Sequence, residues 1–328
     1  MHFAKSIFIT AGILACGSLA WPDPEPIEGV IPHNDREITM DPAIIQRESD
    51  GKFFLFTTGK HKGEGYMWTS PSMRGPWVKT KELVFPDGEP WNAPYVHFLD
   101  GQYYMYYSNN RFDYSLAGVD DPEAKQYWHG SSIFVRSSKT MEPGSWKQHG
   151  HLNIPWSKAY NVLDASLLTV GQSHLDVRGN LLPFGSYQHG LFQIQLGDPP
   201  VRVTPGGLDK LNLLASNMTE GLKHPNPTEA GFIYQLDDFF YLFFSSGRAT
   251  RDEDGTWAGP GDVYKIMVCR SKNPRHGWVD KKGRKCNDGG GTMVLGSHGN
   301  VWAPGGQGVI DFDPDSGYTL LYYHYGKC

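Results

Sequence analysis

A repeat of short aromatic segments is the feature of this sequence that most restricts its fold. Four strong copies begin at turn-forming residues and continue through aromatic and aliphatic side chains: GKFFLF at 51–56, GQYYMYY at 101–107, DDFFYLFF at 237–244 and GYTLLYY at 317–323. A weaker copy, NLLPF at 180–184, lies in the long gap between the second and the third. Such runs favour a β-strand that is covered on both faces over a helix.

Each aromatic segment has neighbours that would complete a small sheet. A short apolar segment precedes every copy, at 42–45, 93–96, 165–168, 230–234 and 308–310. After three of the copies, another segment ends in a glycine and a tryptophan, at 67–77, 133–146 and 266–278. Five such units predict an all-β, single-domain five-bladed β-propeller, whose radial packing leaves only short edges. A β-sandwich with coincidental spacing is the alternative.

The first 20 residues have the layout of a secretory signal peptide, with one lysine, an apolar run and small residues before Ala20. A membrane anchor is the alternative, but the apolar run is too short to span a bilayer. We therefore expect residues 21–328 to form a secreted, extracellular and monomeric protein. The formal net charge is −5 and no Lys/Arg-rich run is present, which argues against nucleic acid or a membrane surface as a partner.

The cysteines and one asparagine carry further expectations for an oxidising compartment. Cys269 and Cys286 are the natural short-loop disulfide, which leaves Cys328 as a terminal thiol. The spacing of these cysteines does not suit a zinc site. Asn217 opens the tripeptide Asn-Met-Thr, which is an acceptor sequence for N-glycosylation.

Acidic residues stand where the predicted inner strands begin. In a propeller these strands start near the axis, so their first residues converge on one pocket; here they are Asp41, Asn92 with Tyr95, Asp164, Glu229 and Gln307. Acids beside buried strands are costly unless they are paired or functional. Repulsion among them would separate their pKa values, as general acid–base hydrolysis requires. Taken singly, an aspartate before a strand is more often a turn or capping residue, so the spacing alone leaves both interpretations open.

These acids and several longer motifs resemble glycoside hydrolase family 43, in particular its fungal endo-1,5-α-L-arabinanases. The most specific stretches are residues 41–51, 54–59, 268–271, 288–295, 297–299, 304–309 and 322–325. The resemblance covers nearly all of the chain after the leader. It implies a propeller that cleaves plant pectic arabinan with inversion of configuration and without an organic cofactor.

The resemblance also assigns roles to the three acids. It makes Asp41 the general base, Glu229 the general acid and Asp164 the residue that orients the acid and tunes its pKa. Inversion requires the base and acid carboxyls to lie about 6.5–9.5 Å apart, so that a water molecule fits between them.

Other residues are expected to contact the sugar. By the resemblance, Asn161, Gly185 and Ser186 lie beside the arabinose unit at the cleavage point. Four tryptophans are candidates for stacking on a sugar ring, with packing inside a blade as the alternative for each: Trp68, Trp91, Trp156 and Trp257.

Three positions depart from the family pattern, and all are expected to line the cleft. Met40 replaces a histidine before the base, Tyr95 replaces an aspartate in the second repeat, and Tyr187 replaces a tryptophan. Endo and exo cleavage therefore both stay open, as do arabinan and arabinoxylan as substrates. The alternatives are an exo-acting α-L-arabinofuranosidase or β-xylosidase on the same fold, and a non-catalytic propeller that binds glycan.

Many bacterial relatives place a histidine beside a metal on the propeller axis, and Gln307 matches that position here. Glutamine is a poor ligand for transition metals but can donate an oxygen to calcium. An axial calcium or other ion is therefore one expectation, and a water molecule is the other. His298 lies nearby in sequence, and a structural role for it is as plausible as a role beside the ion.

Overall fold

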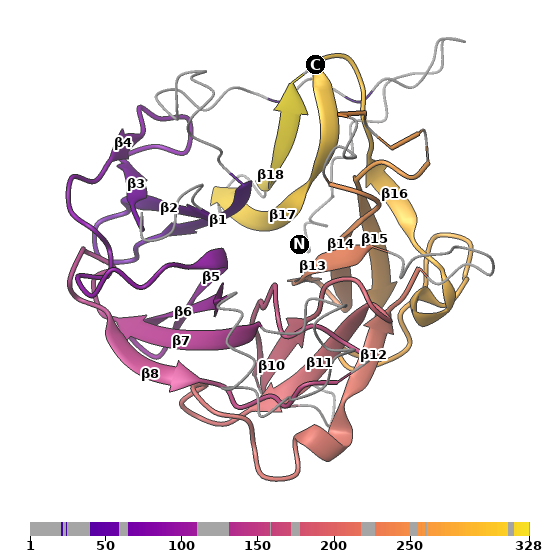
Figure 1. The fold of residues 1–328 in the computed structure, drawn as a ribbon, viewed down its shortest axis with the longest axis horizontal. Helices are drawn as coiled ribbons and strands as arrows, with labels where there is room; N and C mark the ends of the chain where they lie inside the picture. The colour runs from indigo at the N-terminus through magenta and orange to yellow at the C-terminus, as the bar shows by residue number, and fades with distance from the viewer. Residues whose placement is uncertain are drawn as a thin grey trace, which may run out of the picture.

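The computed structural model describes residues 21, 24, 40–58, 65–109, 131–157, 159–171, 178–217, 227–249, 255–256, 258–259, 261–313 and 318–327. The signal-peptide prediction, Trp257 and Cys328 fall outside these residues. In the described segments, strands form five antiparallel sheets around a common axis, seen end-on in Figure 1. No helix in these segments is long and apolar enough to cross a membrane.

Four sheets are blades of four strands, each paired in chain order. The first blade contains β1 (Met40–Gln46), β2 (Phe53–Thr58), β3 (Met67–Ser70) and β4 (Val78–Lys79). The second contains β5 (Asn92–Leu99), β6 (Gln102–Asn109), β7 (Ser132–Ser138) and β8 (Lys147–His151). The third contains β9 (Leu168–Val170), β10 (Gly179–Phe184), β11 (Leu191–Leu196) and β12 (Asn212–Ala215). The fourth contains β13 (Thr228–Leu236), β14 (Phe239–Ser246), β15 (Lys265–Ser271) and β16 (Thr292–Leu295).

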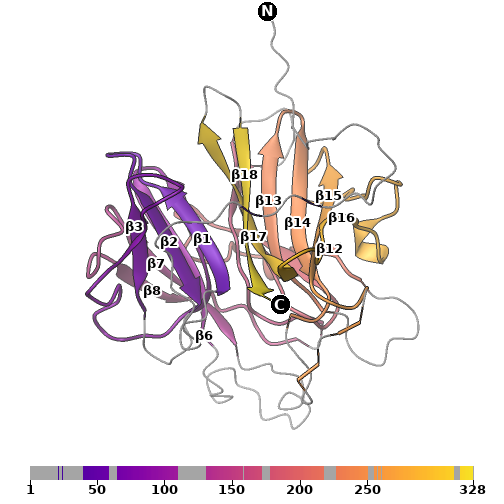
Figure 2. The ribbon, with the colours of Figure 1, turned by 90° about the horizontal axis from the view of Figure 1, so that it is seen from above.

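The fifth sheet is a hairpin of two strands, β17 (Val301–Asp313) and β18 (Tyr318–Lys327). It stands between the first and fourth blades (Figure 2), where β17 contacts β1 and β13. The prediction of five blades is therefore wrong, because the described residues form four blades and this hairpin. The aromatic composition of a strand predicts that the strand belongs to a sheet, but it does not predict how many further strands that sheet contains.

The aromatic strands of the four blades, β2, β6, β10 and β14, are largely buried, which explains their composition. Phe54 and Phe56 of β2 are fully buried and share one cluster with Trp146. The rings of Phe56 and Trp146 meet edge-on with their centroids 5.9 Å apart, an arrangement worth about 1 kcal/mol beyond the area it buries. The tryptophans that end the sequence repeat, Trp77, Trp146 and Trp278, are all buried, so they are packing residues.

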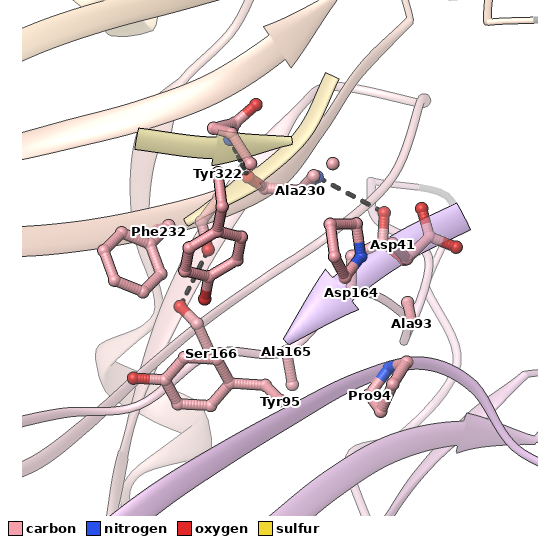
Figure 3. Close-up of a pocket in the computed structure, with 14 residues that line it drawn as sticks. Asp41, Ala93, Pro94, Tyr95, Asp164, Ala165, Ser166, Ala230, Phe232 and Tyr322 are labelled. Atoms are coloured by element: carbon pink, nitrogen blue, oxygen red, sulfur yellow. Dashed lines mark hydrogen bonds between the residues drawn. The ribbon is translucent and has the colours of Figure 1, made fainter. Parts of the chain in front are cut away.

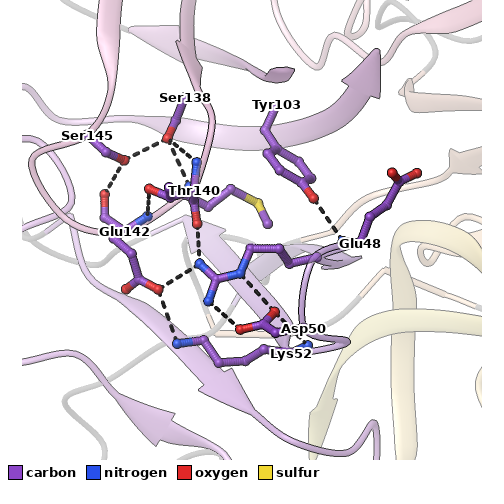
Figure 4. Close-up of polar contacts among 10 residues, drawn as sticks. Glu48, Asp50, Lys52, Tyr103, Ser138, Thr140, Glu142 and Ser145 are labelled. Atoms are coloured by element: carbon purple, nitrogen blue, oxygen red, sulfur yellow. Dashed lines mark hydrogen bonds and ion pairs between the residues drawn. The ribbon is translucent and has the colours of Figure 1, made fainter. Parts of the chain in front are cut away.

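An ion-pair cluster fastens the first blade to the second (Figure 4). The Arg47 guanidinium, directly after β1, donates to Asp50 at 2.9 and 2.7 Å and to Glu142 at 2.7 Å. It also donates to the Thr140 carbonyl, and Lys52 donates to Glu142 at 3.2 Å. The Arg47 side chain is 11% exposed and forked on Asp50, so this cluster is stronger than an isolated surface pair.

The expected disulfide is present and joins two parts of the fourth blade. Cys269 on β15 is bonded to Cys286, which opens the 3-10 helix η2 (Cys286–Asp288). Both cysteines are buried, and they are separated by 17 residues in sequence. The other described helix, η1 (Leu208–Lys210), is a 3-10 turn before β12.

Candidate active site

The backbone bends in the same way where the chain enters each of the five sheets. One non-glycine residue at each entrance has a positive φ: Asp41 (50°), Ala93 (43°), Asp164 (52°), Ala230 (53°) and Ala303 (51°). In β1, β5, β13 and β17 this residue lies inside a register shift of the ladder, which is a β-bulge. Strain of this kind costs about 1 kcal/mol or more per residue and concentrates at functional sites, where bulges re-aim side chains.

The shared positive-φ position shows how the three acids relate to one another. Asp41 and Asp164 occupy the positive-φ position itself, whereas Glu229 lies one residue earlier, next to Ala230. The Ala230 N–H donates to Oδ2 of Asp164 at 3.3 Å, which ties the backbone beside Glu229 to the third blade entrance. The structure therefore brings together the three acids that the sequence analysis selected, from three different sheets.

A pocket on the axis is lined by residues of four sheets and by the segment 164–166, which leads into β9 of the third blade (Figure 3). Asp41 and Asp164 stand at one end of this pocket. Tyr95, Phe232 and Tyr322 form an aromatic wall at the other end. A polar end beside an apolar wall is the usual character of a ligand site.

Asp41 is held from two directions but keeps access to solvent. The Thr58 hydroxyl donates to its Oδ2 at 2.7 Å, and its backbone N–H donates to Nδ1 of His324 at 3.0 Å. Because Nδ1 accepts this bond, the neutral ring of His324 carries its proton on Nε2. The Asp41 side chain is 28% exposed, against 10% for His324, so its carboxylate can reach water. This combination suits a general base.

Asp164 and Glu229 form a coupled pair of carboxyls. Burial is the main cause that raises the pKa of Asp164 well above its usual range, and the charges of Glu229 and Asp41 add to it. Burial also raises the pKa of Glu229, with Asp41 adding to the effect. Because the two carboxyls repel when both are ionised, the pair retains a proton to higher pH than an isolated carboxyl does. For Glu229 itself, burial and the charge of Asp41 favour the protonated form, which is the form a general acid needs.

Both oxygens of Glu229 accept hydrogen bonds. The Ser186 hydroxyl donates to Oε2 at 2.6 Å, and the Tyr264 hydroxyl donates to Oε1 at 2.9 Å. These two bonds lower the pKa of Glu229 and partly oppose the effect of burial. They also fix the direction in which the carboxyl points.

The three residues expected beside the arabinose unit lie around Glu229. Asn161 donates to the Ser186 carbonyl at 2.7 Å, and the two residues are 5% and 3% exposed. Gly185 has a φ of 127°, and a Cβ there would lie 2.5 Å from the Gly190 carbonyl oxygen, so only glycine fits. The structure gives these residues a part in holding the acid, and their contact with a sugar stays a prediction.

Trp91 does not face the cleft. It is 5% exposed, its indole N–H donates to the Thr57 carbonyl at 3.0 Å, and it packs edge-on against Phe85. A side chain at Gly65 would collide with its ring. Trp91 is thus a packing residue in this structure, with no face left for a sugar. Of the other stacking candidates in the described segments, Trp68 is buried and Trp156 is partly exposed.

Gln307 does not open the fifth inner strand, contrary to the sequence analysis. That entrance is Trp302 and Ala303, and Gln307 lies in a second register shift of β17. Its Oε1 accepts from the Ser245 hydroxyl at 2.8 Å and its Nε2 donates to the Ala230 carbonyl at 2.7 Å. Within the described segments, no three His, Cys, Asp or Glu residues are grouped to hold a metal. The axial ion stays a prediction.

Asn217 uses its side-chain nitrogen, the atom to which an N-linked glycan would attach, to donate to the Ser246 hydroxyl at 2.7 Å. Met218 and Thr219 fall outside the described residues. Glycosylation at this site stays a prediction.

Sequence reasoning did not select Thr58, Tyr264 or His324, although all three touch a predicted catalytic acid. For Tyr264 and His324, one signal was present in the sequence: the glycine-rich run at 305–308. Glycines within a strand often mark a place where other groups approach the backbone closely. Which groups approach could not be read without the fold.

An accessible carboxylate beside two buried carboxyls is the arrangement that acid–base hydrolysis of a glycosidic bond requires. A sequence profile for the family described as "Glycosyl hydrolases family 43" matches residues 85–328. The chain therefore belongs to glycoside hydrolase family 43 and is a glycosidase.

Relatives in that family are similar over most of their length. The chain is 40% identical over 296 residues to the probable arabinan endo-1,5-α-L-arabinosidase C of Aspergillus flavus, covering 87% of this chain and 81% of the relative. It is 37% identical over 298 residues to the arabinan endo-1,5-α-L-arabinosidase A of Aspergillus niger, covering 88% and 82%.

Solved structures show the same fold. The α-L-arabinanase of Cellvibrio cellulosa superposes with a TM-score of 0.67 at 25% identity, covering 88% of this chain and 87% of that one. An exo-1,5-α-L-arabinanase from a bovine ruminal metagenomic library superposes with a TM-score of 0.65 at 22% identity, covering 90% of both chains. The second likeness is a likeness of fold alone.

Proposed function

We propose that this glycosidase is an inverting endo-arabinanase that cleaves internal α-1,5-L-arabinofuranosyl linkages of plant pectic arabinan. The carboxyl site is the observation that carries the proposal: a partly exposed Asp41 beside the buried carboxyls of Asp164 and Glu229. The Aspergillus relatives, named for endo action on arabinan, supply the substrate.

In the proposed reaction, water attacks the anomeric carbon of an arabinofuranosyl unit while the bond from that carbon to the glycosidic oxygen breaks. Asp41 takes a proton from the attacking water, and Glu229 gives a proton to the departing oxygen, so the reaction consumes no net proton. Direct displacement from the opposite face inverts the configuration. Asp164 keeps a proton on the pair and, through the Ala230 N–H, holds the backbone beside the acid.

We further propose that residues 1–20 are removed as a signal peptide and that residues 21–328 act outside the cell as a single-domain monomer. The layout of the leader supports secretion. N-terminal sequencing of the secreted protein and light scattering on it would test these two points.

The test is a chromatographic time course of purified protein on linear arabinan, with branched arabinan and arabinoxylan in parallel. The proposal expects oligosaccharides of mixed length in the first minutes. Release of arabinose alone from the start would contradict endo action. Binding of arabinan with no sugar released between pH 4 and pH 8 would show a glycan-binding propeller instead.

Matched variants separate chemistry from folding. Asp41→Asn and Glu229→Gln should each lower kcat by about 10²–10⁴-fold, the range for loss of a general acid or base. Asp238→Asn alters an exposed acid in the turn between β13 and β14 and should leave kcat unchanged.

A further inference from the structure

Two aromatic residues link the backbone of Asp41 to the carboxyl of Glu229. Tyr264, directly before β15, donates its hydroxyl to Oε1 of Glu229 at 2.9 Å. His324, on β18, accepts the Asp41 N–H on Nδ1 at 3.0 Å. The two rings are stacked, with centroids 6.0 Å apart and planes 9° from parallel. A continuous path of contacts therefore runs from the backbone of Asp41 to the carboxyl group of Glu229.

Both rings are fixed by burial and by their other contacts. Tyr264 is 2% exposed, and its hydroxyl also contacts the Ser245 hydroxyl on β14. The side chain of His324 is 10% exposed. Rings held this way have little freedom to shift, so the groups bonded to them are held as well.

The glycines of β17 are what allow this stack to form. A Cβ at Gly305 would collide with the ring of Tyr264. A Cβ at Gly306 would lie 2.5 Å from Nδ1 of His324 and 3.1 Å from Oδ1 of Asp41. Strand glycines are unfavourable unless a close approach requires them, and here it does.

Asp41 needs support of this kind because its backbone is in a strained region, with a φ of 50°. Outside the bulge its N–H would have a ladder partner, and inside it the partner is His324. Without that acceptor, the N–H would lose its hydrogen bond in a half-buried place, and the strained conformation would lose one of the contacts that maintain it.

We propose that the stacked pair of Tyr264 and His324 is a positioning device that holds the acid and the base at a fixed relative placement. The inference rests on the proposed function, in which Glu229 is the acid and Asp41 the base. Neither ring is proposed to touch substrate. The pair sets where the two carboxyls point and, through the Tyr264 hydroxyl, the pH range over which Glu229 keeps its proton.

The first test is Tyr264→Phe, which removes one hydroxyl and keeps the stacked ring. Loss of the bond to Glu229 should lower kcat at least about 10-fold with little change in KM. Because that bond favours the ionised carboxyl, its loss should move the alkaline limb of the kcat profile to higher pH. The titratable groups that face Glu229 are Asp41, Asp164, Tyr187 and Tyr264, and only the last is changed.

The second test compares two variants of His324. His324→Leu removes the acceptor of the Asp41 N–H and should lower kcat by about 100-fold. His324→Asn places an amide oxygen where Nδ1 lies and should recover at least a tenth of wild-type kcat. Tyr325→Phe, on the same strand and 36% exposed, is the control and should match wild type.

The outcomes separate the two proposals. If the wild type releases no sugar from arabinan, the proposed function falls and this inference falls with it. If the wild type is active and Glu229→Gln is not, while Tyr264→Phe and His324→Leu keep wild-type kcat and pH profile, only the positioning role is overturned. An unchanged pH profile together with equal loss in His324→Leu and His324→Asn would also overturn it, because a merely structural defect gives that pattern.

Discussion

Between pH 7 and pH 5 the wild-type protein should lose about 2 kcal/mol more stability than the variant His97→Gln. His97 lies on β5, where its Nε2 is 3.1 Å from the Thr169 hydroxyl, which in turn donates to Asn180 at 2.9 Å. Its Nδ1 is 3.5 Å from the Tyr95 hydroxyl, which donates to the Leu167 carbonyl. An added proton would find no good acceptor, and burial lowers the pKa of His97 from 6.5 to about 4.

The sign and size follow from proton binding. Since the pKa of His97 is lower in the folded state, the unfolded chain binds the proton first as the pH falls. The stability is therefore present above pH 6.5 and is lost as the pH falls toward 4. The full shift corresponds to about 3 kcal/mol, of which about 2 kcal/mol is lost by pH 5.

Urea denaturation at pH 7 and at pH 5 gives the free energy of unfolding of each protein at both values. The difference between the two pH values should be about 2 kcal/mol smaller in His97→Gln than in wild type. His276→Gln changes an exposed histidine and should keep the wild-type difference. An identical pH dependence in wild type and His97→Gln would refute the reasoning, because other titrating groups are common to both proteins.

Three further predictions concern the acid pair, the disulfide and a buried arginine. Asp164→Asn removes the carboxyl whose pKa the charge of Glu229 raises, so the pair loses the site that holds a proton to high pH and the alkaline limb of kcat/KM should move to lower pH in a pH–rate profile. The double variant Cys269→Ala/Cys286→Ala should lose about 3 kcal/mol in urea denaturation, and a loss under 1 kcal/mol would contradict the chain-entropy argument. Arg136→Leu removes the guanidinium that Glu89, whose side chain is 12% exposed, contacts at 2.6 Å, so the free energy of unfolding measured in urea should fall by about 3 kcal/mol or more.

Much of the fold was predictable because its signals are local. The runs at 51–56 and 101–107 contain only residues that suit a strand covered on both faces, and they fold as the buried strands β2 and β6. The acids at 41, 164 and 229 were found because each stands before an inner strand. The number of blades was not predictable in this way, since it depends on strands that have no distinctive composition.

The arrangement inside the site depends on contacts between distant strands. His324 and Asp41 are separated by 283 positions, and their hydrogen bond exists because of a bulge and a glycine that sequence spacing does not reveal. Trp91 also shows that the surroundings of a side chain cannot be predicted from the sequence pattern alone. An aromatic residue beside a loop has the same sequence pattern whether it faces a cleft or, as here, fills the core between two blades.

The most direct test of the acid and base roles uses an α-1,5-arabinotrioside that carries dinitrophenol as its leaving group. Dinitrophenolate departs without needing a proton, so an enzyme that lacks only its general acid can still cleave this substrate. The account predicts that Glu229→Gln retains at least a tenth of wild-type kcat on it while being nearly inactive on arabinan, whereas Asp41→Asn is inactive on both. Equal loss in the two variants on the activated substrate would contradict the assignment of acid and base.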